Sequence, residues 1–287
     1  MSSVEFEEIA HSEGAKVIYQ RVVDSIKLPE HPEFLKRPIK VLDLCGGAGV
    51  VGSLLKSQCE SDFGPVSEAD FATLVDYVNL DRNRGALEKS VGRATWGFVN
   101  ECYSRFCDEE PFDFVLSINP SPAVHQYTPQ ELDRIGVPDD FNPIRGILLD
   151  SAERFSGYQA RITLITAVLL MSREENSRYI LAGFIGKDSF EGTMRFIREN
   201  YLGLKVESDQ RVNLDETTKS LFAVVDTGKK HAKSRRLRTD YDLYRVVTMR
   251  PKGKIDKPKV VTLLNDEIEG DRELAGWCEA QERFGSW

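Results

Sequence analysis

Residues 39–58 read IKVLDL, then CGGAGVVG, then SLLKSQ, and this stretch decides the fold. The first part is a short apolar run of the kind that predicts a buried strand. The glycines that follow permit positive φ angles in a tight turn, and the last part predicts a helix. A strand, a glycine turn and a helix in this order are typical of a parallel α/β sheet, in which the helix N-terminus offers free N–H groups to a ligand.

Strand and helix patterns continue to alternate along the chain. Strands are predicted at 72–80, 94–100, 112–118 and 179–185, and helices at 159–171, 190–201 and 267–284. The ribbons 204–212 and 220–226 are expected to pair as a hairpin, whereas 244–252 and 259–264 are either further strands or β-like pieces of an extension. The sequence therefore predicts an α/β, Rossmann-like fold with a mostly parallel seven-stranded sheet, a terminal antiparallel hairpin and helices on both faces.

Three regions are expected. Residues 1–38 form a helical leader, in which Val17, Ile18, Val22, Val23 and Ile26 have helical spacing. Residues 39–228 form the α/β domain, and 229–287 a basic and then acidic extension. Within the domain, 119–158 is rich in Pro, Asp and Gly and has no clear period, which is typical of a functional loop or a lid.

Charge is unevenly distributed. The net charge is −8, but Lys229 to Lys259 holds twelve Lys/Arg and three Asp, which is +9, so the rest of the chain carries −17. One basic segment on an acidic body favours a local contact with an anionic partner such as RNA. The alternative is a solvated tail or a nuclear-import-like stretch, KKHAKSRR.

Composition also excludes several classes of protein. No apolar stretch approaches the roughly 18 residues of a membrane helix, and the acidic start lacks the apolar region of a secretion signal. The five cysteines form no CxxC pair, and the four histidines are too scattered for a metal site. We therefore expect an intracellular protein, cytoplasmic or nuclear, without a metal and without a membrane anchor.

Asp43 to Gly49, DLCGGAG, resembles the acid-x-Gly-x-Gly-x-Gly signature of class I S-adenosylmethionine-dependent methyltransferases, with Cys45 at the first glycine position. NAD-binding folds share such a turn. The resemblance implies S-adenosyl-L-methionine as the cofactor. It implies that the cofactor is held by Asp43, Cys45, Gly46, Gly47, Ala48 and Gly49, by Asp81 on the ribose hydroxyls, by Asn100 and Glu101 beside the adenine, and by Asn119.

The ribose position needs two further considerations. Asp81 is expected at the end of the second strand, with Asp76 as its rival and a helix N-cap as its alternative role. Asp81 follows Asp43 by 38 residues, more than the roughly 20 of a dinucleotide-type acid. An insertion is therefore expected, and the loop-like, acidic segment 59–70 supplies it.

The acceptor site is expected just beyond the fourth strand, where open α/β sheets bind their ligands. Asn119-Pro120-Ser121-Pro122 resembles the Asn-Pro-Pro-Tyr motif of amino-methylating enzymes, and 140–162 resembles the stretch after it in HemK-like glutamine methyltransferases. Asn119 would then accept hydrogen bonds from a target nitrogen. A proline-rich loop start is the alternative.

Residues 39–230 also resemble FtsJ-like RNA ribose methyltransferases, which are implied to use a Lys-Asp-Lys-Glu set. Its first lysine falls on Lys16, but the other positions fall on Ile118 or Asn119, Ala182 and Ser220. Lys187 lies near the second lysine position without matching it. The loss weakens transfer to a ribose hydroxyl, because that hydroxyl is a poor nucleophile without a positioned base.

Three functions stay open at this point. The first is an FtsJ-like RNA methyltransferase with Asn119, Lys16 and Lys187 as catalytic candidates and the basic segment on the phosphates. The second is a HemK-like N-methyltransferase of a protein side chain or small molecule. The third is a catalytically silent binding subunit with a methyltransferase fold.

Overall fold

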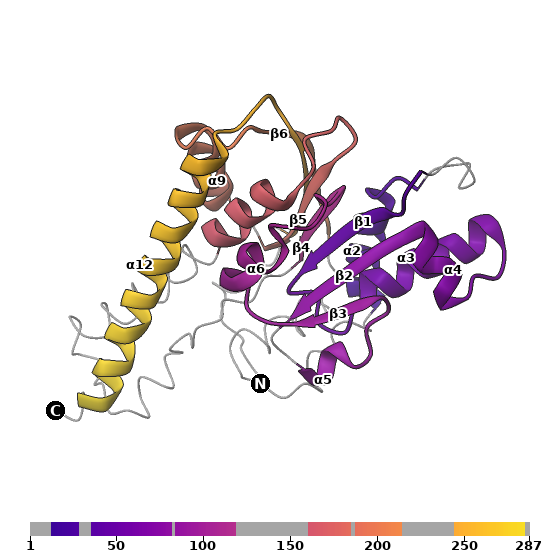
Figure 1. Cartoon of the computed structure of the whole chain (residues 1–287), viewed down its shortest axis with the longest axis horizontal. Helices are drawn as coiled ribbons and strands as arrows, with labels where there is room; N and C mark the ends of the chain where they lie inside the picture. Colours follow the sequence, from indigo (N-terminus) through magenta and orange to yellow (C-terminus); the bar gives the residue numbers. More distant parts are fainter. Residues whose placement is uncertain are drawn as a thin grey trace.

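The computed structural model describes residues 13–28, 36–81, 84–118, 160–184, 187–213 and 244–284. Its centre is a seven-stranded sheet of order β3-β2-β1-β4-β5-β7-β6 (Figure 1). The strands are β1 (Ile39–Leu44), β2 (Val75–Asp81), β3 (Arg93–Trp96), β4 (Phe114–Ile118), β5 (Arg178–Phe184), β6 (Leu204–Arg211) and β7 (Tyr244–Pro251). The first five are parallel, and β7 is antiparallel to both of its neighbours. The predicted fold class is confirmed.

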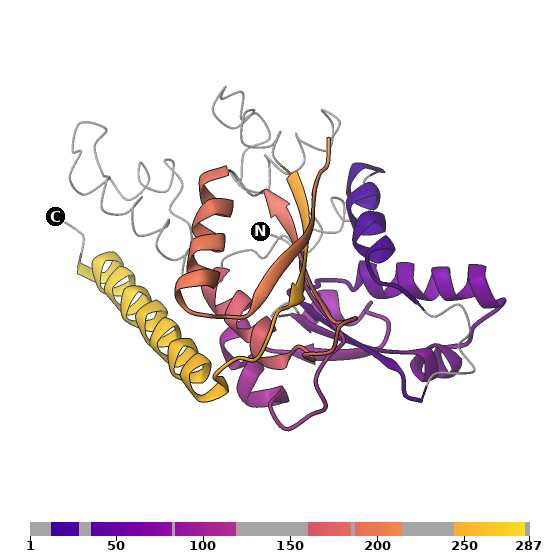
Figure 2. The same cartoon turned by 90° about the horizontal axis from the view of Figure 1, so that it is seen from above.

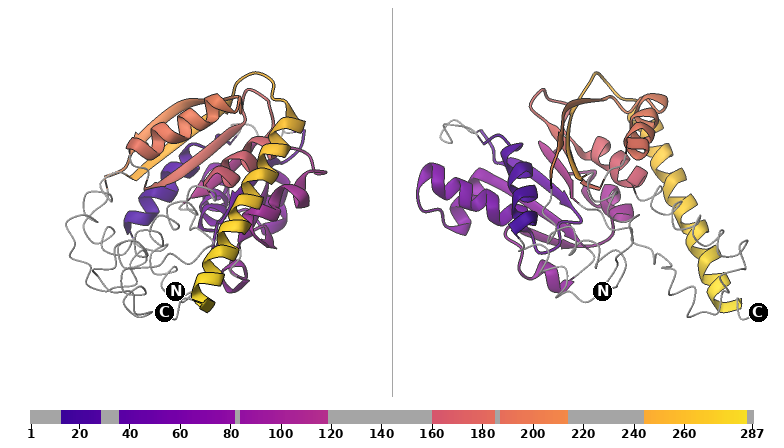
Figure 3. Two further views of the ribbon diagram at one scale, coloured as in Figure 1. Left: turned by 90° about the vertical axis from the view of Figure 1, so that its left-hand side faces the viewer. Right: turned by 180° about the vertical axis from the view of Figure 1, so that it is seen from behind.

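Helices cover both faces of the sheet (Figures 2 and 3). One face packs on α2 (Glu13–Asp24), α3 (Val50–Phe63) and α4 (Glu68–Leu74). The other packs on α6 (Val99–Phe106), a helix at 160–170, α9 (Lys187–Glu199) and α12 (Lys257–Phe284). A short helix, α5 (Arg84–Leu87), joins β2 to β3. Because side chains alternate along a strand, Val41 enters one core and Leu42 the other.

The predicted antiparallel pairing at the end of the sheet is present, with β6 as one of its strands. β6 pairs with β7, whereas 220–226 lies outside the described residues. β7 occupies an internal place between β5 and β6, so the sheet continues past residue 228, where the α/β domain was expected to end. The side chains of Tyr244 to Met249 are buried, as an internal strand requires. Residues 259–264 belong to α12 and are not a strand.

The predicted insertion is helical and not loop-like. α3 runs to Phe63, and α4 begins after Ser67, whose hydroxyl accepts a hydrogen bond from the Asp70 N–H at 3.1 Å. The Asp70 carboxylate in turn accepts from the Ser67 N–H, which completes a capping box. The predicted second strand, 72–80, is therefore the end of α4 followed by β2.

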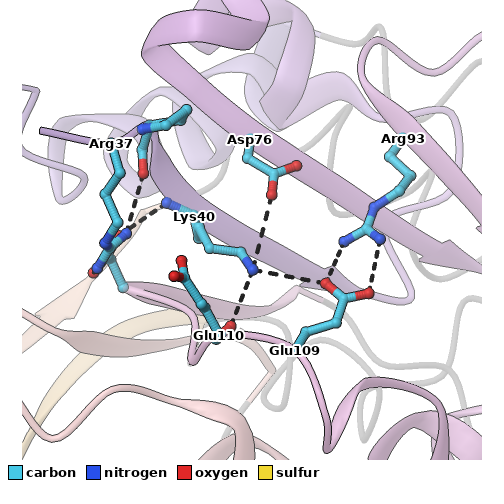
Figure 4. Close-up of polar contacts among 8 residues, drawn as sticks. Arg37, Lys40, Asp76, Arg93, Glu109 and Glu110 are labelled. Atoms are coloured by element: carbon cyan, nitrogen blue, oxygen red, sulfur yellow. Dashed lines mark hydrogen bonds and ion pairs between the residues drawn. The ribbon is translucent and has the colours of Figure 1, made fainter. Parts of the chain in front are cut away.

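The amino ends of the parallel strands form one edge of the sheet, called here the amino edge, and it holds a paired charge network (Figure 4). The buried Lys40 ammonium donates to the Glu110 carbonyl at 3.0 Å and lies 3.6 Å from Glu109 and 4.0 Å from Asp76. Arg93 binds Glu109 through two hydrogen bonds of 2.8 and 2.7 Å.

Arg37 completes the network on the other side of β1. Its guanidinium binds both carboxylate oxygens of Asp113 at 2.7 Å, and Asp113 also accepts from the Lys40 backbone N–H at 2.9 Å. The hydrogen bonds to Asp113 raise the pKa of Arg37 above its ordinary value. These pairs fix the starts of β1 and β4 side by side.

Candidate cofactor site

The glycine turn lies at the opposite edge, where β1, β2 and β4 end; this is the carboxyl edge. Cys45 donates its N–H to the Leu80 carbonyl at 2.8 Å and takes a φ of +65°. Gly47 and Gly49 have φ angles of +55° and +70°, and Gly49 precedes the first residue of α3. Ala48 lies half-buried between them. The predicted strand, turn and helix are thus present, with a cysteine in a backbone conformation that favours glycine.

At two positions of the turn, neighbouring side chains lie too close for any residue other than glycine. A Cβ atom at Gly46 would lie 2.5 Å from the Asn79 Oδ1 and 2.6 Å from the Asp43 carboxyl carbon. A Cβ atom at Gly49 would meet the side chain of Ser90. The turn therefore lies directly on the polar side chains of β1 and β2.

Asp43 is buried beneath this turn. Its Oδ2 accepts a hydrogen bond from the Tyr77 hydroxyl at 2.6 Å, and its Oδ1 has no hydrogen-bond partner in the described part of the chain. Burial raises the pKa of Asp43 to about 7; the Tyr77 bond lowers it and the nearby Asp81 charge raises it further. From α2, Tyr19 faces the same carboxyl, and burial and the Asp43 charge raise its pKa to about 12.

Asn79 is a site residue that the sequence did not reveal. Its Nδ2 donates to the Gly47 carbonyl at 2.9 Å and to the Ser90 Oγ at 3.0 Å. Its Oδ1 is buried and, among the described residues, has no partner. The only signal was an amide within the apolar run of β2, two residues before Asp81.

Asp81 ends β2 and reaches the turn. Its Oδ2 accepts a hydrogen bond from the Gly47 N–H at 2.9 Å. The described part of the next helix, α5, begins at Arg84, and residues 82 and 83 lie outside the described residues, so the N-cap alternative stays a prediction. The rival Asp76 lies at the amino edge beside Lys40. Of the two acids, only Asp81 is placed at the glycine turn.

The residues predicted to face an adenine lie in a helix. β3 ends at Trp96, so Asn100 and Glu101 belong to the first turn of α6. Glu101 is exposed, with its carboxylate 3.6 Å from Arg105. Asn100 is half-buried, and its Oδ1 has no partner within the described ranges.

Trp96 and Phe98 are exposed, at 43% and 37%. Their rings meet edge to face with centroids 6.3 Å apart, and the Arg84 guanidinium lies 4.3 Å above Trp96. The Gly97 N–H between them donates to the Asp81 carbonyl at 3.1 Å. This aromatic pair therefore borders Asp81 at the carboxyl edge.

The catalytic candidates are placed only in part. Asn119 lies outside the described residues, directly after Ile118, the last residue of β4. Lys16 is exposed on α2, one turn before Tyr19. Lys187 is the first residue of α9, and its side chain is not described. Ala182, at a lysine position of the FtsJ-like set, is fully buried in β5.

Other features of the described residues point elsewhere. A hollow of about 620 Å³ lies between α3 and α4 and is lined by Glu60, Pro65, Val66, Ser67 and Asp70, on the amino side of the sheet. Within the described ranges, no three metal-ligating side chains come together, and no helix is long and apolar enough to cross a membrane.

No protein-family model and no curated protein matches the sequence. Similar solved structures include a TehB-like S-adenosylmethionine-dependent methyltransferase of Corynebacterium glutamicum, with 14% identity, 85% of this chain and 99% of that chain covered, and a TM-score of 0.36. A fibrillarin of Aeropyrum pernix, solved with natively bound S-adenosyl-L-methionine, has 11% identity, 82% and 74% coverage, and a TM-score of 0.41.

Magnesium protoporphyrin IX methyltransferase of Synechocystis, solved with the same cofactor, has 11% identity, 87% and 90% coverage, and a TM-score of 0.44. At such values the likeness concerns the course of the chain. It does not establish what this chain binds.

Proposed function

We propose that this chain is an S-adenosylmethionine-dependent methyltransferase that acts on RNA. The observation that supports the proposal best is the set of buried acceptors beneath the glycine turn. Asp43 Oδ1 and Asn79 Oδ1 are both buried without partners among the described residues. The Asn79 Oδ1 and the Asp43 carboxyl group, through its carbon and its Oδ2, line the space in which a Gly46 side chain would stand.

The polar groups of the cofactor complement this set. S-adenosylmethionine carries an ammonium and two ribose hydroxyls, which donate hydrogen bonds, and the site offers the acceptors Asp43, Asn79 and Asp81. A buried acceptor without a donor is costly, so a cationic donor is the ligand group that fits best. Trp96 and Phe98 offer an aromatic surface of the kind on which an adenine stacks.

When bound, the cofactor would supply a sulfonium methyl group, which moves to a nucleophile while the sulfur keeps the bonding pair as a thioether. The chain's own residues hold the glycine turn and the Asp43 carboxyl in fixed orientations. Asp81 fixes the Gly47 N–H, Asn79 fixes the Gly47 carbonyl, and Tyr77 fixes the Asp43 carboxyl. Alignment of this sort is the main requirement for transfer to a neutral nitrogen.

The choice of RNA rests on where the basic segment is attached. β6 ends and β7 begins at the carboxyl edge, because Arg211 pairs with Arg245 and Phe184 with Tyr244. The connection between them, residues 214–243, includes Lys229 to Arg238 and is therefore attached at both ends at the same edge of the sheet as the glycine turn. The buried Ala182 offers no lysine base, which favours a base nitrogen over a ribose hydroxyl as acceptor.

The cofactor part is tested by calorimetric titration with S-adenosylmethionine and its demethylated product. Asp81→Asn should weaken binding roughly 10- to 150-fold, since hydrogen bonds to a charged group contribute about 1.5–3 kcal/mol. Asp76→Asn is the matched control on the same strand, and it should bind as the wild type does. Absence of binding by the wild-type protein would favour the silent binding subunit instead.

The acceptor part is tested by transfer of a labelled methyl group to RNA. Replacing the six Lys/Arg of 229–238 by Gln should abolish transfer and reduce the salt dependence of RNA affinity, with cofactor binding intact. Transfer to protein and not to RNA would contradict the proposal and favour the HemK-like alternative. In that alternative, Asn119→Ala abolishes transfer.

A further inference from the structure

The C-terminus of α9 has an unusual residue in its cap. The Leu202 N–H donates to the Ile197 carbonyl at 3.1 Å and the Tyr201 N–H to the Arg198 carbonyl at 3.3 Å, which is the Schellman pattern. In this motif the residue at the position of Tyr201 takes a left-handed conformation and is usually glycine. Tyr201 takes it with φ +53°.

A bulky side chain is disfavoured there, and nothing in the described fold compensates for it. The Tyr201 side chain is 75% exposed, and its one ring contact in the described part of the chain is with Lys259, whose Nζ lies 5.5 Å from the ring centroid. A strained and exposed aromatic residue indicates a ring that serves a contact outside the fold.

Lys259, whose ammonium lies beside this ring, belongs to a basic segment. The Lys252 N–H donates to the Gly203 carbonyl at 2.8 Å, which ties the turn after β7 to the cap of α9. Between Arg250 and Lys259 the sequence has five cations and one acid, Asp256. The four lysines of this stretch are exposed.

Two of the cations also face each other across the hairpin. Lys205 of β6 lies directly opposite Arg250 of β7, and like charges in this position repel. In the part of the chain that the structure describes, neither forms an ion pair with a carboxylate. A polyanion laid across the hairpin would relieve this repulsion.

A hollow of about 250 Å³ adjoins the ring, between α9 and α12. It is lined by Asn200, Lys259, Val260, Thr262, Leu263 and Asp266. The lining combines an apolar floor with amide, hydroxyl and carboxylate groups, which are the groups that hydrogen-bond to base edges.

We propose that Tyr201 and the lysines of 250–259 form a contact site for single-stranded nucleic acid, in which one base stacks on the Tyr201 ring and the phosphates lie on the lysines. Aromatic rings flanked by cations are the usual elements of such sites. The site lies at the amino edge, and β7 with its eight residues separates it from the carboxyl edge by about 26 Å. It is therefore distinct from the proposed methyl-transfer site, and it requires no catalysis.

The test measures the affinity of the full chain for a 12-nucleotide RNA by fluorescence anisotropy at several salt concentrations. Tyr201→Gly should weaken binding roughly 5- to 150-fold, as loss of one stacked base does. Because glycine suits the left-handed cap, the same variant should raise the Tm by roughly 2–4 °C, so the loss cannot come from misfolding. Lys252→Gln and Lys259→Gln should each reduce the salt slope by about 0.7.

Unchanged RNA affinity in Tyr201→Gly would overturn the proposal. If Tyr201→Gly lost as much affinity for an abasic oligonucleotide as for the RNA, the proposed stacking of a base on Tyr201 would be overturned. An equally strong, Tyr201-dependent affinity for a polyglutamate peptide would identify an acidic protein as the partner and also overturn it. Cofactor affinity of the same variants should equal that of the wild type. A failure of the proposed contact site is therefore distinguishable from a failure of the proposed function.

Discussion

The amino edge and the carboxyl edge of the sheet differ in whether their charged side chains have partners. At the amino edge, Lys40 and Arg37 are each satisfied by carboxylates or carbonyls of the chain itself. At the carboxyl edge, Asp43 is buried with one oxygen unpartnered among the described residues and with another acid, Asp81, nearby. The first arrangement stabilises the fold, whereas the second destabilises it.

This contrast separates structural charge from ligand-binding charge. A buried ionised group without a partner costs several kcal/mol. The fold tolerates this cost at the carboxyl edge, where the glycine turn lies, and avoids it at the amino edge. The difference shows that the Lys40 network is part of the scaffold and that Asp43 and Asn79 are suited to a donor from outside.

The largest expected effect is that of Asp43→Asn. The carboxyl has its ordinary pKa of 3.8 when unfolded and about 7 when folded, so folding takes up a proton between these values. Stability therefore falls as pH rises through this window, and the loss is complete above about pH 7. The variant should be more stable than the wild type by about 2–4 kcal/mol at pH 8 and by little at pH 4.

Urea unfolding at pH 4, 6 and 8 measures this difference, and cofactor titration should show weaker binding by the same variant. Asp76→Asn is the control, because Asp76 faces Lys40 across 4.0 Å. It should not be stabilised at any of these pH values. A stability difference between Asp43→Asn and the wild type that does not grow with pH would remove the contrast between the edges.

Lys40→Met should have the next largest effect, in the opposite direction. It leaves Glu109, Asp76 and the Glu110 carbonyl without the ammonium, and we expect a loss of about 2 kcal/mol, since the two carboxylates are partly exposed. Cofactor affinity should not change. The control is Lys56→Met, which removes an exposed pair with Glu60 and should cost less than about 0.5 kcal/mol. Equal effects of the two variants would show that the Lys40 network does not stabilise the fold.

Cys45→Gly should have the smallest effect. Cys45 holds a φ of +65°, and glycine adopts this conformation without strain, so we expect a gain of about 1 kcal/mol in thermal or urea unfolding. Gly47→Ala is the reciprocal test, because no atom lies within 4 Å of its Cβ position and only its φ of +55° is unfavourable. It should lose about 1 kcal/mol. If Cys45→Gly and Gly47→Ala changed the free energy of unfolding in the same direction, this explanation of the turn would be contradicted.

Local patterns predicted the first strand, the glycine turn and Asp81 well, because each depends on a few neighbouring residues. The alternation of strand and helix patterns along the chain also predicted a mostly parallel sheet. The partner of β6 could not be predicted in this way, since about 30 residues separate Arg211 from Tyr244 and pairing at that distance leaves no local signal.

The site was predicted less completely than the fold. Asn79 resembled an ordinary residue of an apolar strand, and only the approach of Gly46 to its Oδ1 reveals its place. Aromatic residues are usually buried, and no local pattern indicates that Trp96 and Phe98 are exposed; their exposure follows from the place of β3 at the end of the sheet, between α5 and α6. Asn119 stays a prediction.

β7 comes last along the chain among the described strands, yet it takes an internal place in the sheet. Before Tyr244 to Pro251 leave the ribosome, β5 has an open hydrogen-bonding edge and β6 has no neighbour in the order that the finished sheet shows. Open edges of this kind pair readily with other chains. Nascent or shortened chains that end before Pro251 are therefore the forms of this protein most exposed to aggregation and most dependent on chaperones.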